Sequence, residues 1–297
     1  MKYFYYSGCS LEGTALEYNI STQAMMRALG IELLELEDWT CCGASAAETI
    51  SDLLSLVLPA RNLALAEQMD MDCDFLIPCS ACYLNLRKVD ERAKREDGLL
   101  DKINEVLGEE GLGYQGGIKS RHLLDVIVTD IGSEMIRSHV KRELSGLRVA
   151  LYYGCQALRP YGGYDDPEKP RCMEPVIEAL GAEVHDWTMG AKCCGAGLMT
   201  TKKEVAIELT SSLLEAAKGA DCIATVCPMC QMNLDSYQKM ASKVKQENLS
   251  ISVLYLPQLI GMAFGLGEED LKLGLNMAYT DSLKAKLAEC RVGTTPQ

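Results

Sequence analysis

The chain has 297 residues, enough for one large domain or two ordinary ones, and 48% of them are hydrophobic and 24% charged, as in a globular protein. Its formal net charge of −13 argues against nucleic acid as a partner, because most of such a surface would repel phosphates. The N-terminal MKYFYYSGCSLEG has no long apolar core, so we expect no secretory signal and place the fourteen cysteines in a reducing, cytoplasmic compartment, where structural disulfides are rare.

Strand-like and helix-like segments alternate in the first part of the chain. KYFYY (2–6), IELLEL (31–36) and DFLIP (74–78) are predicted strands, because they are short and rich in aromatic and branched residues. Residues 18–29, which stop at Gly30, and residues 48–69 have apolar residues at helical spacing. We expect the charged segment 88–111 to form a solvated helix.

The second part of the chain repeats this alternation. RVALYY (148–153), AEVHDW (182–187), CIATV (222–226) and ISVLYL (251–256) are predicted strands. Residues 173–180 and 203–218 are predicted helices. The run 249–267 carries no charge and is close to the length of a membrane span. Serine, proline and glycine interrupt it, so we expect a strand followed by a helix and no membrane span.

Three sequence blocks occur twice in the same order. YYSGCSLEG returns as LYYGCQALRP, RALGIELLELEDWTCCGA as EALGAEVHDWTMGAKCCGA, and CDFLIPCSACYLNL as ADCIATVCPMCQMNL. This predicts a duplication, with one domain at 1–145 and a second at 146–297. The strand–helix order in each copy predicts an α/β fold of two Rossmann-like parallel-sheet halves related by a pseudo-two-fold axis. The cysteines would lie at the carboxyl ends of strands, where such sheets place ligands.

Five cysteines of each copy match in order and spacing. They are Cys9, Cys41, Cys42, Cys79 and Cys82 in the first copy, and Cys155, Cys193, Cys194, Cys227 and Cys230 in the second. Disulfides would leave one thiol over, a structural zinc takes four ligands, and a redox C-x-x-C needs only two. An iron–sulfur cluster offers several irons and uses all five. We expect the glycine of CCG to adopt positive φ close to the cluster, and the helix after CCG to direct its N-terminus at the thiolates.

Four further cysteines lie outside this pattern: Cys73, Cys172, Cys222 and Cys290. We interpret them as small hydrophobic residues.

The pattern C…CCG…C-x-x-C, present twice over nearly the whole chain, resembles the CCG domain family, and a chain with both copies resembles the B subunits of methanogen heterodisulfide reductases. The resemblance implies two non-cubane [4Fe-4S] clusters that face one another across a cavity, each held by the five cysteines of one copy. It also implies that the mixed disulfide of coenzyme M and coenzyme B is reduced there to two thiols, the final step of methanogenesis.

Partners also follow from the resemblance. Electrons would come from a small ferredoxin-like subunit, a flavin-containing subunit and a hydrogenase or formate dehydrogenase. The chain itself has neither a ferredoxin-type cysteine run nor a dinucleotide-binding fingerprint.

Several basic residues are candidates to contact the anionic half-substrates that the family uses. They are Lys192, Arg159 and His185, with Arg87 and Lys88 as further candidates, and His185 or His122 could donate protons. Other hypotheses remain open at this stage: a zinc-stabilised scaffold, zinc in one copy only, or a thiol:fumarate or quinone-linked CCG redox protein.

Overall fold

The chain folds into two four-stranded sheets in which every strand pairing is parallel. The computed structural model describes residues 1–44, 46–69 and 71–290. The first sheet has the order β2-β1-β3-β4 and the second the order β6-β5-β7-β8. The strands are β1 Lys2–Tyr5, β2 Glu32–Glu35, β3 Phe75–Ile77, β4 Ser120–His122, β5 Arg148–Tyr152, β6 Glu183–His185, β7 Cys222–Thr225 and β8 Ser252–Tyr255. This confirms the predicted α/β class and its duplicated halves, while the strand β4 was not predicted.

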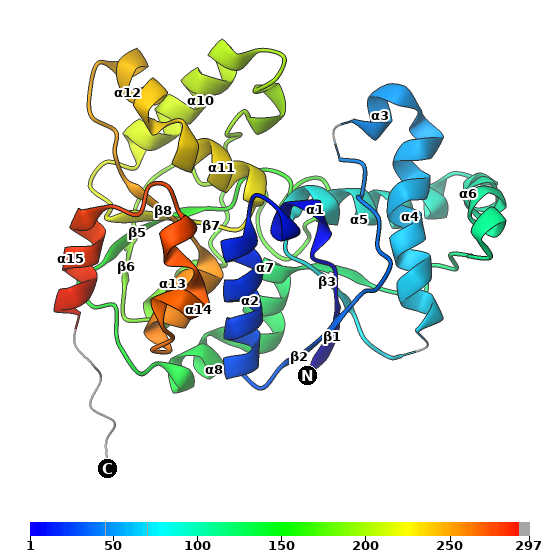
Figure 1. The fold of residues 1–297 in the computed structure, drawn as a ribbon, viewed down its shortest axis with the longest axis horizontal. Coiled ribbons are helices and arrows are strands. Elements are labelled where there is room, and N and C mark those ends of the chain that lie inside the picture. Colours follow the sequence, from blue (N-terminus) through cyan, green and yellow to red (C-terminus); the bar gives the residue numbers. More distant parts are fainter. Residues whose placement is uncertain (45, 70, 291–297) are drawn as a thin grey trace.

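Helices connect the strands and cover the sheets (Figure 1). Those of the first half are α1 Gly8–Glu12, α2 Leu16–Ala28, α3 Ala47–Ile50, α4 Asp52–Gln68, α5 Ser80–Arg95, α6 Leu99–Leu107, α7 Leu123–Val126 and α8 Gly132–His139. Those of the second half are α9 Glu174–Ala179, α10 Lys203–Ala216, α11 Pro228–Ser236, α12 Gln238–Lys245, α13 Leu256–Ala263, α14 Glu268–Leu271 and α15 Asp281–Glu289.

Two predicted helices are each divided in two. The expected helix over 48–69 breaks at Ser51, whose hydroxyl accepts a hydrogen bond from the Leu54 amide and caps α4. The charged segment 88–111 was wrongly predicted as one solvated helix. Its first part completes α5, and its second part forms α6, whose residues Leu99, Ile103 and Leu107 are buried. Helix α6 packs against α4, so its apolar face serves the core.

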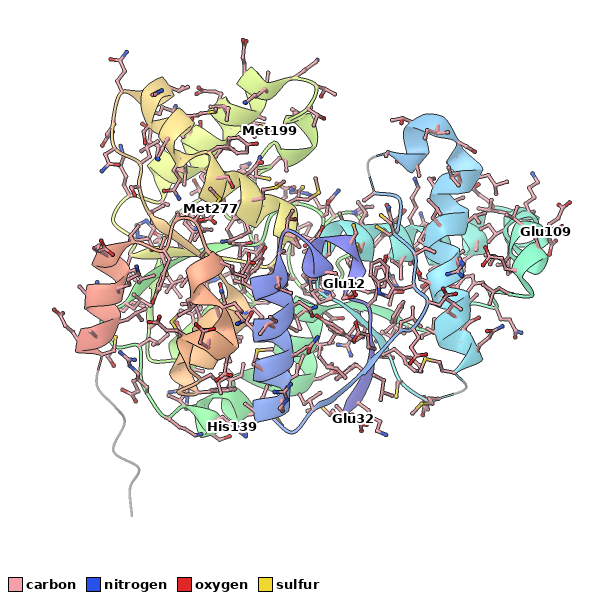
Figure 2. The ribbon with its side chains drawn as sticks, viewed as in Figure 1. Glu12, Glu32, Glu109, His139, Met199 and Met277 are labelled. Carbon is pink, nitrogen blue, oxygen red and sulfur yellow. The ribbon has the colours of Figure 1, made fainter. Side chains whose placement is uncertain are left out.

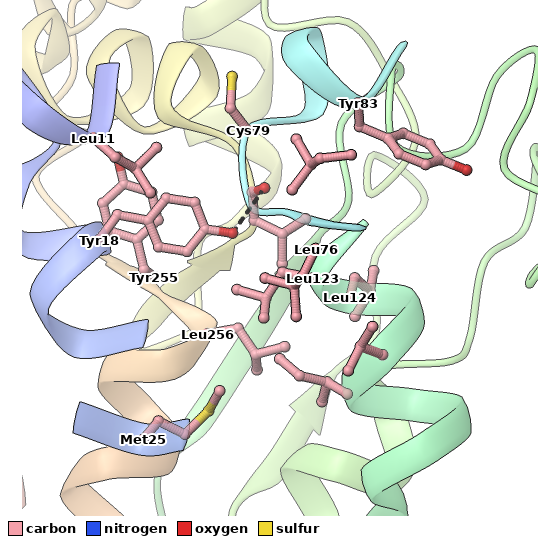
Figure 3. Close-up of a cluster of buried hydrophobic side chains, with 14 of the residues drawn as sticks. Leu11, Tyr18, Met25, Leu76, Cys79, Tyr83, Leu123, Leu124, Tyr255 and Leu256 are labelled. Carbon is pink, nitrogen blue, oxygen red and sulfur yellow. Dashed lines mark hydrogen bonds between the residues drawn. The ribbon is translucent and has the colours of Figure 1, made fainter. Parts of the chain in front are cut away.

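The two halves share one hydrophobic core. Helix α2 of the first half packs against α13 of the second, and α8 packs against α9. One cluster of buried side chains therefore contains residues of both halves, among them Tyr18, Leu123, Tyr255 and Leu256 (Figure 3). The boundary between residues 145 and 146 stays a prediction.

The outer surface is acidic, with Glu12, Glu32 and Glu109 among its exposed carboxylates (Figure 2).

The uncharged run 249–267 forms β8 and α13, as predicted. Among the described helices, none combines the length and the apolar character that a membrane crossing needs.

Candidate metal centre

The central strands of each sheet deliver the cysteines to the same edge. Cys9 and Cys155 follow β1 and β5, and Cys79 and Cys227 follow the neighbouring strands β3 and β7. Because parallel strands end at one edge of a sheet, these loops lie side by side. Cys79 and Cys227 are also the N-cap residues of α5 and α11, so both stand at the positive end of a helix dipole.

The first-half cysteines form one chain of contacts. The Sγ atoms of Cys9 and Cys41 lie 3.7 Å apart, and those of Cys42 and Cys82 lie 3.3 Å apart. Side-chain hydrogen bonds join Cys41 to Cys42 and Cys79 to Cys82, which completes the set. The thiols of Cys9 and Cys41 are exposed and the other three are buried.

All five second-half cysteines line one cavity of about 170 Å³. The Sγ atoms of Cys194 and Cys230 lie 3.6 Å apart, and hydrogen bonds join Cys155 to Cys193 and Cys227 to Cys230. Five thiols around one small cavity fit a polynuclear iron–sulfur group, which uses cysteine ligands.

Hydrogen bonding within each set favours the thiolate at particular positions. The hydrogen bond from Cys41 is the main cause that holds the pKa of Cys42 well below its usual value. The bond from Cys155 lowers the pKa of Cys193 to about 6, and the bond from Cys230 lowers the pKa of Cys227 to about 6. Thiolates are the form that binds metal. In the described part of the chain, no three or more His, Cys, Asp or Glu side chains are grouped as ligands of one metal ion.

A tyrosine in each half supports the cysteine pair. Tyr6 donates its hydroxyl to the carbonyl of Thr40 at 2.7 Å, and Tyr152 donates to the carbonyl of Lys192 at 2.7 Å. Thr40 and Lys192 each directly precede the adjacent cysteines. These tyrosines were not predicted as site residues, although both stand three residues before the first cysteine of their copy.

An asparagine in each half fixes the second cysteine of the pair. The side-chain amide of Asn85 donates to the carbonyl of Cys42 at 3.0 Å, and that of Asn233 donates to the carbonyl of Cys194 at 3.1 Å. The repeated CYLN and CQMN carried this signal, because both asparagines follow the last cysteine by three residues on a helix.

The glycines of CCG have positive φ, as predicted, but for a different reason. Gly43 has φ +71 and Gly195 has φ +80. A Cβ at Gly43 would lie 2.8 Å from Leu58 Cδ1, and one at Gly195 would lie 2.9 Å from Ala206 Cα. Because these glycines lack a side chain, a helix can pack closely against each of them, α4 against Gly43 and α10 against Gly195. The residue that lets the backbone approach the thiols is the glycine before the first cysteine, since a Cβ at Gly154 would lie 3.1 Å from Cys230 Sγ.

The prediction that a helix starting after CCG points at the thiolates was wrong. CCG is followed by the four-residue α3 in the first half and by the 3₁₀ turn Ala196–Leu198 in the second. Helices α5 and α11 take that position, because the C-x-x-C cysteines stand at their N-termini.

The basic candidates differ in what they contact. Lys192 and His185 line a cavity of about 710 Å³, which shares Tyr153 with the cysteine cavity. Arg159 instead pairs with Glu168 at 2.8 Å and donates to backbone carbonyls, including that of Ala191 at 2.6 Å. Its guanidinium thereby ties the loop after Cys155 to the segment before Cys193.

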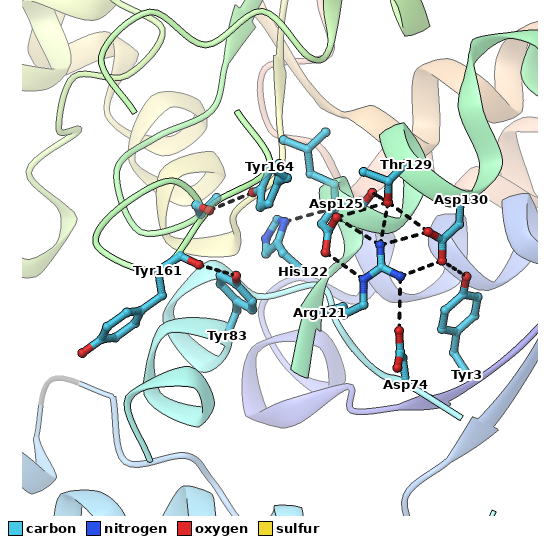
Figure 4. Close-up of polar contacts among 12 residues, drawn as sticks. Tyr3, Asp74, Tyr83, Arg121, His122, Asp125, Thr129, Asp130, Tyr161 and Tyr164 are labelled. Atoms are coloured by element: carbon cyan, nitrogen blue, oxygen red, sulfur yellow. Dashed lines mark hydrogen bonds and ion pairs between the residues drawn. The ribbon is translucent and has the colours of Figure 1, made fainter. Parts of the chain in front are cut away.

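The other candidates lie on or under α5. Arg87 pairs with Glu91 at 2.8 Å and Lys88 with Glu48 at 3.0 Å. His122 is fully buried between the halves beside Tyr83 and Tyr164 (Figure 4). The four cysteines outside the two sets are buried or half-buried in the protein interior.

Comparisons with known proteins agree with this arrangement. The model of the CCG family, described as a cysteine-rich domain, matches residues 3–87 and 149–235. The membrane anchor subunit of 8-methylmenaquinol:fumarate reductase from Wolinella succinogenes is 39% identical, over 95% of this chain and 98% of its own length. A relative from Archaeoglobus profundus, named for its likeness to the B subunit of heterodisulfide reductase, is 32% identical, over 97% of this chain and 99% of its own length.

A crystal structure of a hypothetical protein from Helicobacter pylori has the same fold, with a TM-score of 0.74 and 17% identity, over 94% of this chain and 52% of that one. Both copies of the cysteine pattern lie inside the matched family segments. The chain belongs to the CCG family of cysteine-rich domains.

Proposed function

We propose that this chain is an iron–sulfur redox subunit of a larger oxidoreductase, with one polynuclear cluster held by the five matched cysteines of each half. The observation that carries the proposal is the convergence of all five second-half cysteines on one cavity, with an equivalent set in the first half. When bound, each cluster would supply electron storage and a Lewis-acidic iron beside the substrate. A non-cubane [4Fe-4S] geometry is the form that the resemblance to the family favours.

The chain's own residues prepare each site. Buried cysteines exclude water from the inner side, while the exposed Cys9, Cys41 and Cys193 leave the outer side open to a partner or substrate. The backbone contacts made by tyrosine and asparagine fix the cysteine pair before any metal arrives, which lowers the cost of ordering the ligands.

Electron transfer linked to a quinol is the first candidate reaction. It is favoured by the 39% identity to the fumarate reductase protein, against 32% for the heterodisulfide reductase-like relative. Assay of the anaerobically isolated complex with menaquinol analogues and fumarate tests it, and rapid oxidation of the quinol is the expected result.

Reduction of the coenzyme M–coenzyme B disulfide is the second candidate. The large cavity beside Cys193 supports it, because the ammonium groups of Lys192 and Lys169 line it and could contact anionic half-substrates. The lining also holds Glu168, Glu174 and Asp186, and Arg171 pairs with Glu174 at 2.7 Å. Under this reaction the partners would be a small ferredoxin-like subunit and a flavin-containing subunit. Turnover of the mixed disulfide without quinol oxidation by the same complex would favour this candidate.

Zinc in one half, or in both as a scaffold, is the competing assignment of the metal. Quantification of iron, acid-labile sulfide and zinc in anaerobically purified protein decides between them. We further propose a cytoplasmic location, because clusters and free thiols both require reducing conditions.

A further inference from the structure

The large cavity beside Cys193 is built from segments in which the second half departs from the first. Its volume of about 710 Å³ is typical of a small-molecule site, and it shares Tyr153 with the cavity of the five second-half cysteines. Lys192, which directly precedes Cys193, also lines it. A molecule bound in this cavity therefore lies against the loop that carries Cys193.

One wall of the cavity is the segment before the cysteine pair. In both halves a tryptophan packs edge-on against the tyrosine that supports the pair, with ring centroids 5.7 and 6.1 Å apart. Trp39 stands two residues before the pair, whereas Trp187 stands six residues before it. The longer segment 188–192 lines the cavity. The indole of Trp187 is fixed there, because it donates a hydrogen bond to the Leu151 carbonyl at 3.0 Å.

The other wall is the loop after the first cysteine. In the first half, α1 and α2 follow β1 directly, whereas residues 156–173 of the second half, all of them described, form a loop without a helix. Residues 168–171 of this loop line the cavity. Arg159 joins the two walls, since it donates to the carbonyl of Pro167 at 2.9 Å and to that of Ala191 at 2.6 Å. The protein's own contacts therefore hold the cavity in shape before a ligand binds.

The chemistry of the lining fits a ligand with an apolar body and an oxygen that accepts hydrogen bonds. Trp187 offers an aromatic surface, and ion pairs with arginines at 2.8 and 2.7 Å neutralise Glu168 and Glu174. The charged side chains of the lining that have no ion pair in the described part of the chain are Asp186, Lys169 and Lys192. A quinone carbonyl and a sulfonate both present an oxygen that a lysine ammonium can bind.

We propose that this cavity is the substrate site of the chain and that the substrate exchanges electrons with the second-half centre alone. The first-half centre then passes electrons between the second-half centre and the partner subunit. This inference rests on the proposed iron–sulfur function, and it differs from the arrangement that the family resemblance implies, in which both centres face one cavity. A quinol would give up two electrons and release two protons to water, whereas a disulfide would take up two electrons and two protons and leave as two thiols.

The shared core supports this transfer between the centres. The hydroxyl of Tyr18 lies 3.2 Å from the carbonyl oxygen of Pro78 and 3.2 Å from that of Val226, and these residues directly precede the first C-x-x-C cysteine of each half. The C-x-x-C loops are thus side by side, so an electron can move from one centre to the other inside the protein.

Titration calorimetry of the anaerobically purified full chain tests the proposal, with 2-methyl-1,4-naphthoquinone and, separately, the disulfide of 2-mercaptoethanesulfonate as probes. Thr188→Trp places a large ring at an exposed position of the lining and should weaken binding about tenfold at unchanged iron content. The control Glu37→Trp changes the matching exposed position of the first half, three residues after Leu34 as Thr188 is after His185, and should leave binding unchanged.

EPR of the wild-type chain identifies the centre that meets the substrate. A bound probe should change the signal of the centre that is lost in Cys193→Ala and leave the other signal unchanged. Binding of the naphthoquinone alone would identify a quinol as the substrate, and binding of the disulfide alone would identify a disulfide.

The outcomes separate this inference from the proposed function. Equal affinity in Thr188→Trp and Glu37→Trp, no binding of either probe, or a change in both EPR signals would overturn the inference while the clusters stand. A protein without iron and labile sulfide would overturn the proposed function and this inference with it.

Discussion

The ring of Tyr18 stacks on the ring of Tyr255, with centroids 4.0 Å apart and planes 4° from parallel. The Tyr18 hydroxyl lies 3.2 Å from the carbonyl oxygen of Pro78 and 3.2 Å from that of Val226. These two residues directly precede Cys79 and Cys227, so one fully buried side chain connects the C-x-x-C loops of both halves. The two candidate centres are thus held together by the core that the halves share.

Tyr18→Phe should lower the free energy of unfolding by about 2 kcal/mol, because it keeps the stacked ring but removes the buried hydroxyl shared by the Pro78 and Val226 carbonyls, of which Val226 still accepts from Ser80. It should also lower the iron content of both halves. The control is Tyr5→Phe, which removes a buried hydroxyl bonded to Asn19 within the first half. Denaturant unfolding and iron analysis measure both effects, and iron loss in the control alone would contradict the role given to Tyr18.

Asn85→Ala and Asn233→Ala should each remove about half of the bound iron, because each frees the second cysteine of one pair. Loss of such a supporting contact costs about 10- to 100-fold in metal affinity. Asn104→Ala is the matched control, since Asn104 fixes the backbone of Tyr114 away from the cysteines. Full iron content in both test variants would contradict the proposed support.

The neutral His122 makes stability depend on pH. Its folded pKa of about 4 lies below the usual 6.5, although the nearby Asp125 raises it in part. The unfolded chain therefore takes up the proton first, and this stability is present above pH 6.5 and is lost as the pH falls toward 4. Between pH 7.5 and 5.5 the wild type should lose about 1 kcal/mol more unfolding free energy than His122→Gln. If the free energy of unfolding fell by the same amount with pH in both proteins, the result would contradict a buried, neutral His122.

Substitution of Lys192 and substitution of Arg159 should have different effects. Lys192→Ala should keep the iron content and raise the KM for an anionic substrate about tenfold, because an exposed ammonium is lost from the large cavity. Arg159→Ala should instead reduce stability and second-half iron, since the guanidinium ties together the loops that carry Cys155 and Cys193. Steady-state kinetics with metal analysis measures both, and equal effects of the two variants on KM alone would contradict this division.

The sequence predicted the fold class, the parallel sheets and the cysteine pattern because these depend on local periodicity and on a repeat visible in one chain. It misplaced the helix N-termini that face the thiols, because CCG and C-x-x-C were equally plausible helix starts. The segment 88–111 looked solvated because its charges outnumber Leu99, Ile103 and Leu107, which nevertheless reach the core.

The contacts between the halves were not accessible from the sequence. Ser80, His122 and Val226 are far apart in the chain, and their meeting depends on how two sheets dock. The repeat shows that Tyr6 and Asn85 each recur in the second copy. It does not show which backbone carbonyl their side chains bind.

Anaerobic quantification of iron, acid-labile sulfide and zinc per chain tests the central claim most directly. Two four-iron clusters predict about eight irons with about eight sulfides and no stoichiometric zinc. A colourless protein with one or two zinc ions and no labile sulfide would contradict the account.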